Sequence, residues 1–174
     1  LGLEGDQAYP ALLQERFHRE GYDLTVVNAG VSGDTTAAGL RRAEWSLAGD
    51  VRILIVALGG NDGLRGLPVE QMKQNLTEIV ALARDRGIPV LLAGMEAPPN
   101  YGSVYTAEFR AAFQDVADDF AVAFMPFLLD GVAAVPALNQ PDGIHPTAEG
   151  SAIVANRVYE ALAPLLVGLP STVR

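Results

Sequence analysis

One stretch of the chain constrains its fold more than any other. The run VRILIVAL at residues 51–58 is almost continuously apolar and carries a single charge, on Arg52. Strands with one face in water alternate apolar and polar residues, whereas continuous apolar strands are typical of parallel sheets, whose faces are both covered by helices. The polar sequence Gly-Gly-Asn-Asp at 59–62 ends the run. The stretch therefore predicts a strand of a parallel sheet that is buried on both faces.

Further β-branched runs alternate with helical periodicity along the chain. We expect strands at 24–27, 90–93 and 122–125, and helices at 8–20, 35–47, 69–86, 106–120 and from Thr147 onward. Asp34 is expected to cap the second of these helices, and Pro164 to kink or end the last one. Strands that alternate with helices form right-handed βαβ units. The predicted fold class is α/β: a three-layer α/β/α sandwich with a mostly parallel, flavodoxin-like sheet.

The length predicts a single domain over residues 1–174. Its first recognisable element is a helix, whereas a doubly wound fold normally starts with a strand. The first residue, Leu1, is not a methionine. We therefore expect the first strand to precede Leu1, so that the domain is incomplete at its N-terminus.

Composition excludes several classes of function. The net charge of −9 argues against nucleic acid as a partner, because an acidic surface repels phosphate backbones. Cysteine is absent and histidine occurs only at positions 18 and 145, so neither a thiolate nor a multi-histidine metal site is expected. No phosphate-binding glycine motif is present, and no cofactor is expected. The longest apolar-looking stretch, 121–138, is interrupted by prolines and Asp130, so no stable membrane anchor is predicted. The oligomeric state is left open.

Three polar clusters are candidates for a functional site. They occupy residues 28–35, 59–62 and 142–146; the first two follow predicted strands, and the third precedes the last helix. In open parallel sheets, ligands bind beyond the carboxyl ends of the strands. We therefore expect the fold to bring all three clusters to one edge of the sheet.

Asp142 and His145 stand three positions apart, with Gly143 between them. A tight turn would bring the carboxylate to the imidazole Nδ1 and leave Nε2 as a general base. The alternative is that both are only turn residues. Asn61 could aim its side-chain amide at an oxyanion, and Gly33 could offer its backbone N–H; alternatively both belong to simple turns. Asp62 is expected to be a cap or turn anchor.

Other reactive residue types are expected to have no catalytic role. His18 lies among charges on a helix and is predicted to be a surface residue. Trp45 is predicted to have a packing role, with a platform for the substrate as the alternative. Ser32, Ser103 and Ser151 were considered as nucleophiles, but none lies in a Gly-x-Ser-x-Gly elbow.

The three motifs, extended to 28–36 (Asn-Ala-Gly-Val-Ser-Gly-Asp-Thr-Thr), 59–66 (Gly-Gly-Asn-Asp-Gly-Leu-Arg-Gly) and 142–146 (Asp-Gly-Ile-His-Pro), carry a family resemblance. In them the sequence resembles SGNH hydrolases of the GDSL esterase/lipase superfamily, in particular the bacterial thioesterase, arylesterase and lysophospholipase branch. The resemblance spans nearly the whole chain, with the motifs in the order typical of the family.

The resemblance implies specific roles. Gly33 and Asn61 match the oxyanion residues of the family, and Asp142 and His145 match the acid and base of its catalytic triad. The Gly-Asp-Ser-Leu block with the nucleophilic serine is not in this sequence. Because Leu1-Gly2-Leu3 resembles the end of the loop after that block, the serine is expected upstream of Leu1. The alternative is a chain that starts at Leu1 and lacks a nucleophile.

The expected function is a serine esterase for short- to medium-chain acyl or aryl esters, with thioesters and lysophospholipids as related substrates. The expected partner is a small-molecule ester, selected by the loops at 63–67, 96–104 and 133–140. By resemblance, the protein is bacterial, and periplasmic or secreted rather than cytoplasmic. Two alternatives stay open: a carbohydrate O-acetylesterase on the same scaffold, and a non-catalytic binding protein if the serine is truly absent.

Overall fold

The computed structural model describes residues 5–167 and 169, which fall into two compact units. The first, the sheet unit, runs from Gly30 to Leu128. The second, the helix-pair unit, combines the chain up to Ala29 with the chain from Leu129 onward. Each unit is described by itself.

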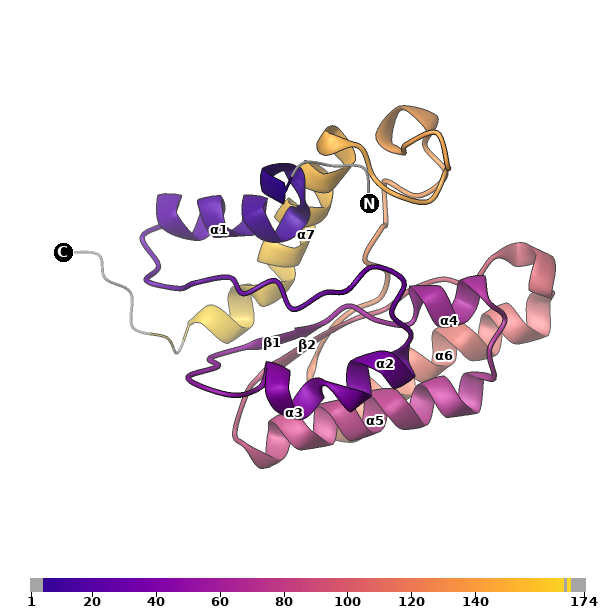
Figure 1. Ribbon diagram of the computed structural model, residues 1–174, viewed down its shortest axis with the longest axis horizontal. Coiled ribbons are helices and arrows are strands. Elements are labelled where there is room, and N and C mark those ends of the chain that lie inside the picture. The colour runs from indigo at the N-terminus through magenta and orange to yellow at the C-terminus, as the bar shows by residue number, and fades with distance from the viewer. Residues whose placement is uncertain (1–4, 168, 170–174) are drawn as a thin grey trace. The chain divides into compact units, whose positions relative to one another are not determined.

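The sheet unit contains three parallel strands in the order β1-β2-β3 (Figure 1). They are β1 (Leu54–Val56), β2 (Val90–Ala93) and β3 (Ala123–Met125). In register, Ile55 lies opposite Leu91, and Leu92 lies opposite Phe124. The predicted parallel pairing and the predicted span of β2 are confirmed.

Five helices belong to this unit: α2 (Thr36–Arg41), α3 (Ala43–Ser46), α4 (Gly60–Leu64), α5 (Val69–Asp85) and α6 (Ser103–Phe120), with a short 3₁₀ turn, η2 (Pro99–Tyr101). Figure 1 shows α5 and α6 side by side along one face of the sheet. Their buried faces form the core with Val56, Val90 and Leu92. Apolar residues at helical spacing, such as Met72, Leu76 and Val80, therefore bury one stripe of α5, as the sequence predicts.

The strand predicted at 51–58 is shorter and less buried than expected. Only 54–56 form β1, and of these Val56 alone is fully buried. The strand that is buried throughout is β2, because it pairs with β1 on one side and β3 on the other. Within the described residues β1 pairs with β2 only, which limits its burial.

The helix predicted at 35–47 is divided into α2 and α3 at Arg42, whose φ of −111° departs from helical geometry. The prediction that Asp34 caps this helix is wrong. Thr35 caps α2, because the Thr35 side chain accepts a hydrogen bond from the N–H of Ala38 at 3.4 Å. The Asp34 carboxylate instead pairs with Arg42 at 2.8 Å.

The helix-pair unit is built on α1 (Tyr9–Arg19) and α7 (Ala148–Leu166), with 3₁₀ turns η1 (Gly5–Gln7) and η3 (Pro136–Leu138). The two long helices pack through Phe17, whose ring centroid lies 5.9 Å from that of Tyr159. Thr147 caps α7 by accepting the N–H of Gly150 at 3.3 Å, which confirms the predicted start of this helix. The helix continues two residues beyond Pro164 and ends at Leu166.

The strand predicted at 24–27 is wrong: no strand is assigned to these residues. The side-chain amide of Gln14 occupies the backbone groups that a sheet ladder would use. Its Nε2 donates to the carbonyl of Leu24 at 2.9 Å, and its Oε1 accepts the N–H of Val26 at 2.6 Å. The segment is extended but is held by a helix side chain.

Candidate active site

Asp142 and His145 form a direct contact in the helix-pair unit. The Oδ2 of Asp142 lies 2.7 Å from the Nδ1 of His145, and Oδ1 accepts the backbone N–H groups of Ile144 and His145, each at 3.0 Å. Gly143 makes the turn possible, because its φ of +69° lies in the left-handed region that glycine tolerates. Both carboxylate oxygens are therefore engaged by groups within three residues.

This arrangement determines the charge of Asp142. The N–H of His145 lowers the pKa of the Asp142 carboxyl most, followed by the N–H of Ile144 and the imidazole, to well below the usual range. Asp142 is thus ionised near neutral pH and can only accept hydrogen bonds. It follows that Nδ1 of His145 carries the proton, and Nε2 presents its lone pair as a base.

We expect the carboxyl of Asp142 to titrate well below the ordinary value of about 3.9. Because its pKa is depressed in the folded protein, its stabilising contribution is present above about pH 4 and is lost as the pH falls through the folded-state pKa. An NMR titration of the side-chain carboxyl carbon measures the midpoint. The backbone N–H groups outrank the imidazole as causes, so His145→Ala should retain most of the lowering. A midpoint at the ordinary value in the wild type would contradict the assignment.

Gln140, which the sequence analysis did not single out, holds the turn in place. Its N–H donates to the carbonyl of His145 at 2.7 Å, and its side-chain Nε2 donates to the carbonyl of Pro146 at 2.9 Å. Its own carbonyl accepts the N–H of Gly143 at 2.8 Å. The partners of Gln140 in these bonds are backbone groups, which every residue has. The sequence around Gln140 therefore does not indicate that it supports the turn.

The loop ahead of the turn encloses a shallow pocket. The buried Asn139 holds this loop by donating its side-chain amide to the carbonyls of Val132 and Val135, at 2.6 and 2.9 Å. The pocket has a volume of about 480 Å³ and is lined by Ala134, Val135, Pro136, Asn139, Gln140, Pro141 and Gly143. It coincides with the predicted substrate loop at 133–140 and continues into the turn that carries His145.

Gly33 and Asn61 lie in the sheet unit. Asn61 donates one hydrogen of its side-chain amide to the carbonyl of Asp34 at 3.0 Å, and an amide NH₂ has a second hydrogen available for a ligand. Gly33 is exposed, with a φ of +85°. Among residues 5–167 and 169, its N–H donates no hydrogen bond. The structure therefore brings Asn61 into contact with Asp34, the residue after Gly33. The second amide hydrogen of Asn61 and the N–H of Gly33 are both available as donors.

Asp62 anchors the first motif, as expected of it. Its buried carboxylate accepts the N–H of Thr36 at 2.9 Å and the hydroxyl of Thr36 at 2.6 Å. The same hydroxyl oxygen accepts a hydrogen bond from Asn75 at 3.0 Å. Asn75 was missed from the sequence, because it lies 39 residues from Thr36 along the chain, and Thr36 itself entered only as the last residue of a motif. Arg65, which entered only as part of a motif, donates to the carbonyl of Gly33 at 2.9 Å.

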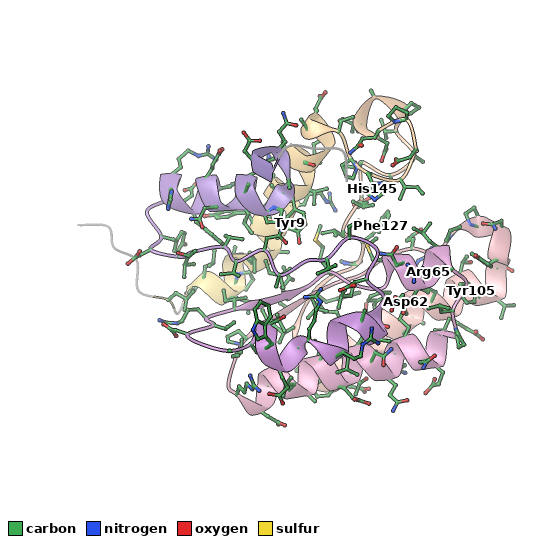
Figure 2. All side chains as sticks on the ribbon, viewed as in Figure 1. Tyr9, Asp62, Arg65, Tyr105, Phe127 and His145 are labelled. Carbon is green, nitrogen blue, oxygen red and sulfur yellow. The ribbon has the colours of Figure 1, made fainter. Side chains whose placement is uncertain are left out.

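Two tyrosines fasten the segment that follows Asn61. The hydroxyl of Tyr101 donates to the carbonyl of Leu64 at 3.0 Å, and that of Tyr105 donates to the carbonyl of Leu67 at 2.7 Å. Burial raises the pKa of Tyr105, so this phenol stays a hydrogen-bond donor near neutral pH. The predicted substrate loops at 63–67 and 96–104 are thereby joined. Figure 2 shows Asp62, Arg65 and Tyr105 on the same side of the sheet unit.

The remaining candidates have other places in the structure. His18 is exposed on α1, as predicted, but Trp45 is 77% exposed and its predicted packing role is wrong. On α3, Ala43 and the following Leu47 face the core, and Trp45 stands midway between them on the opposite side.

Of Ser32, Ser103 and Ser151, none forms a hydrogen bond with His145 in the part of the chain that the structure describes. Nor do the described residues contain a cluster of His, Asp or Glu that could hold a metal ion.

Carboxylic ester hydrolases use an imidazole oriented by a carboxylate as a base, and amide N–H groups as oxyanion donors. Groups of both kinds are present in this protein. The family model described as "GDSL-like Lipase/Acylhydrolase family" matches residues 2–153 of this chain. The chain belongs to the GDSL-like lipase/acylhydrolase family. It is a carboxylic ester hydrolase, which confirms the enzyme class predicted from the motifs.

Curated relatives cover most of the chain. Esterase TesA of Pseudomonas aeruginosa is 46% identical over 167 residues, which is 95% of this chain and 83% of that protein. Arylesterase of Vibrio mimicus is 35% identical over 90% of this chain and 79% of its own length. Thioesterase 1/protease 1/lysophospholipase L1 of Escherichia coli K12 is also 35% identical, over 94% of this chain and 78% of that protein. The resemblance seen in the motifs is therefore confirmed.

Solved structures confirm the predicted fold class. The crystal structure of TesA matches with a TM-score of 0.91 at 44% identity, covering 95% of this chain and 93% of that chain. The esterase EstA from Pseudoalteromonas, inhibited by monoethylphosphonate, matches with a TM-score of 0.90 at 31% identity, covering 95% of this chain and 91% of the other. AlinE4, an SGNH-hydrolase family esterase, matches with a TM-score of 0.77 at 41% identity, covering 98% and 90%. The fold is the α/β sandwich of the SGNH hydrolases.

Proposed function

We propose that this protein is a serine esterase that uses His145 as its general base and Asp142 as the residue that orients it. The observation that carries the proposal is the 2.7 Å contact between the Asp142 carboxylate and the Nδ1 of His145. It leaves Nε2 as the basic atom, which is the arrangement that a serine nucleophile requires. The nucleophile is proposed to be a serine upstream of Leu1, and the resemblance to the family supports this assignment.

The reaction follows from these roles. The serine oxygen attacks the ester carbonyl while Nε2 of His145 takes the hydroxyl proton, giving a tetrahedral oxyanion. The N–H of Gly33, the amide of Asn61 and the N–H of the serine would stabilise the oxyanion. His145 then returns the proton to the departing alcohol, which leaves an acyl-serine. A water molecule attacks the acyl-serine while His145 takes its proton. Collapse of the second oxyanion breaks the bond to the serine oxygen, which regains the proton from His145, and releases the carboxylic acid.

The proposed substrates are short- to medium-chain acyl or aryl esters, with thioesters and lysophospholipids as related classes. The pocket of about 480 Å³ has mostly apolar lining residues, which suits a small apolar group beside the turn that carries His145. The names of the relatives, esterase, arylesterase and thioesterase 1/protease 1/lysophospholipase L1, support the same range.

We further propose that both compact units belong to one SGNH hydrolase domain, because the family match at residues 2–153 includes parts of both. The three curated relatives come from bacteria, which supports a bacterial source. A periplasmic or secreted location is proposed from the family resemblance alone. No helix within the described residues combines the length and apolar character needed to cross a membrane.

A fluorophosphonate probe tests the proposed chemistry directly. We expect the protein, expressed as its gene encodes it, to gain one covalent phosphonyl adduct, because an activated serine displaces fluoride from the phosphorus of the probe. Intact-mass measurement detects the adduct, and peptide mapping identifies the serine. His145→Ala should label far more slowly, whereas the matched variant His18→Ala should label like the wild type. Absence of an adduct in the wild type would favour a non-catalytic binding protein.

A further inference from the structure

Helix α4 and the residue that ends it hold the loop around Gly33 through three side chains. Asn61 donates to the carbonyl of Asp34 at 3.0 Å, and Arg65 Nη2 donates to the carbonyl of Gly33 at 2.9 Å. These two residues stand four apart and therefore lie on one side of the helix. Asp62, between them, accepts two hydrogen bonds from Thr36. The carbonyls of two consecutive residues, 33 and 34, are thus each held by a side chain.

The contact from Arg65 matters most for the geometry of Gly33. With a φ of +85° and no side chain, Gly33 has more backbone freedom than its neighbours. A hydrogen bond from a charged guanidinium is stronger than one between neutral groups. By fixing the carbonyl of Gly33, it restricts rotation of this residue, whose N–H donates no hydrogen bond among the described residues.

The backbone around Arg65 is held in place, while its side chain lies at the surface. The N–H of Leu67 donates to the carbonyl of Asp62 at 3.0 Å, so the backbone forms a hydrogen-bonded turn that includes Arg65. On either side, Tyr101 and Tyr105 donate their hydroxyls to the carbonyls of Leu64 and Leu67. In the described part of the chain, Arg65 forms no ion pair with a carboxylate. Its recorded polar contact is the one with Gly33.

We propose that Arg65 is a positioning residue for the oxyanion site: its guanidinium fixes the carbonyl of Gly33 and thereby aims the N–H of Gly33 at the oxyanion. The inference rests on the proposed function, in which that N–H is an oxyanion donor. Arg65 does not touch the substrate. An oxyanion develops only on the way to the tetrahedral intermediate, so the contribution of Arg65 appears in kcat and hardly in KM.

The test compares variants of the protein as its gene encodes it, with a neutral aryl acetate as substrate. We expect Arg65→Ala to lower kcat by about ten-fold with little change in KM, a smaller effect than the 10²–10³ typical of removing an oxyanion donor itself. Arg65→Lys should retain part of the activity, since an ammonium can still donate one hydrogen bond. Added guanidinium ion should restore part of kcat in Arg65→Ala. The matched control is Arg86→Ala, because Arg86 also donates to a backbone carbonyl, that of Leu47 at 3.2 Å.

Several results would overturn the inference. One is wild-type kcat in Arg65→Ala. A second is an increase in KM confined to an ester with an anionic group, which would make Arg65 a substrate-binding residue. A third is a fall in kcat that parallels the loss of folded protein in circular dichroism and is not restored by guanidinium. An inactive wild-type protein would overturn the proposed function together with this inference, whereas an active wild type with an equally active Arg65→Ala overturns the inference alone.

Discussion

Replacing His145 with alanine is expected to lower kcat for an aryl acetate by about 10⁶-fold, the loss that removal of the base causes in a Ser-His-Asp system. The serine hydroxyl is a weak nucleophile without a base to take its proton. The geometry gives His145 this role because Asp142 engages Nδ1 and thereby leaves Nε2 basic. Steady-state hydrolysis, followed by absorbance of the released phenol, measures the effect.

The matched control is His18→Ala, which removes the other histidine of the chain from an exposed position on α1. It should leave kcat and the melting temperature unchanged, since isolated surface substitutions usually have small effects. His145 is itself half-exposed, so His145→Ala should also fold normally. Substantial activity in a folded His145→Ala protein would mean that another group serves as the base.

The parts of the fold that could be predicted are those that depend on local burial. β2 was predicted at its observed residues because all four are apolar and lie in the middle of the sheet. The long helix α5 was predicted to within one residue, because its apolar stripe repeats at helical spacing. The strand expected at 24–27 has three β-branched residues, but its backbone is bonded to the side chain of Gln14. No propensity or periodicity in the segment itself encodes that partner.

The candidate site shows the same division between local and distant contacts. Asp142 and His145 are three residues apart, so spacing and one glycine made their contact a candidate beside a plain turn, and the family resemblance favoured the contact, which the structure contains. Asp62 and Thr36 are 26 residues apart, and Arg65 and Gly33 are 32 apart. Each of these contacts includes a backbone group, the N–H of Thr36 or the carbonyl of Gly33, and the partners lie far apart along the chain, so no local pattern in the sequence marks them. Only the folded chain reveals that the second motif holds the first.

Replacing Asn61 with alanine is expected to lower kcat by about 10²–10³-fold, equivalent to about 2.7–4 kcal/mol of transition-state stabilisation. The reason is that Asn61 offers the second hydrogen of its amide to the oxyanion while the first is bonded to Asp34 at 3.0 Å. KM should change little, because the ester carbonyl of the bound substrate carries far less charge than the oxyanion. Steady-state kinetics with the same aryl acetate separate kcat from KM.

The bond to Asp34 means that Asn61→Ala also removes a support of the loop, so the two effects must be separated. A structural effect would lower the melting temperature and raise KM, whereas loss of an oxyanion donor lowers kcat in a protein of unchanged stability. The matched control is Asn156→Ala on α7, which removes a surface asparagine bonded to Arg16 and should leave kcat unchanged. Since the N–H of Gly33 would still contribute, Asn61→Ala should remain more active than His145→Ala. Unchanged turnover by Asn61→Ala would exclude the oxyanion role of Asn61 and leave Gly33 as the donor of this unit.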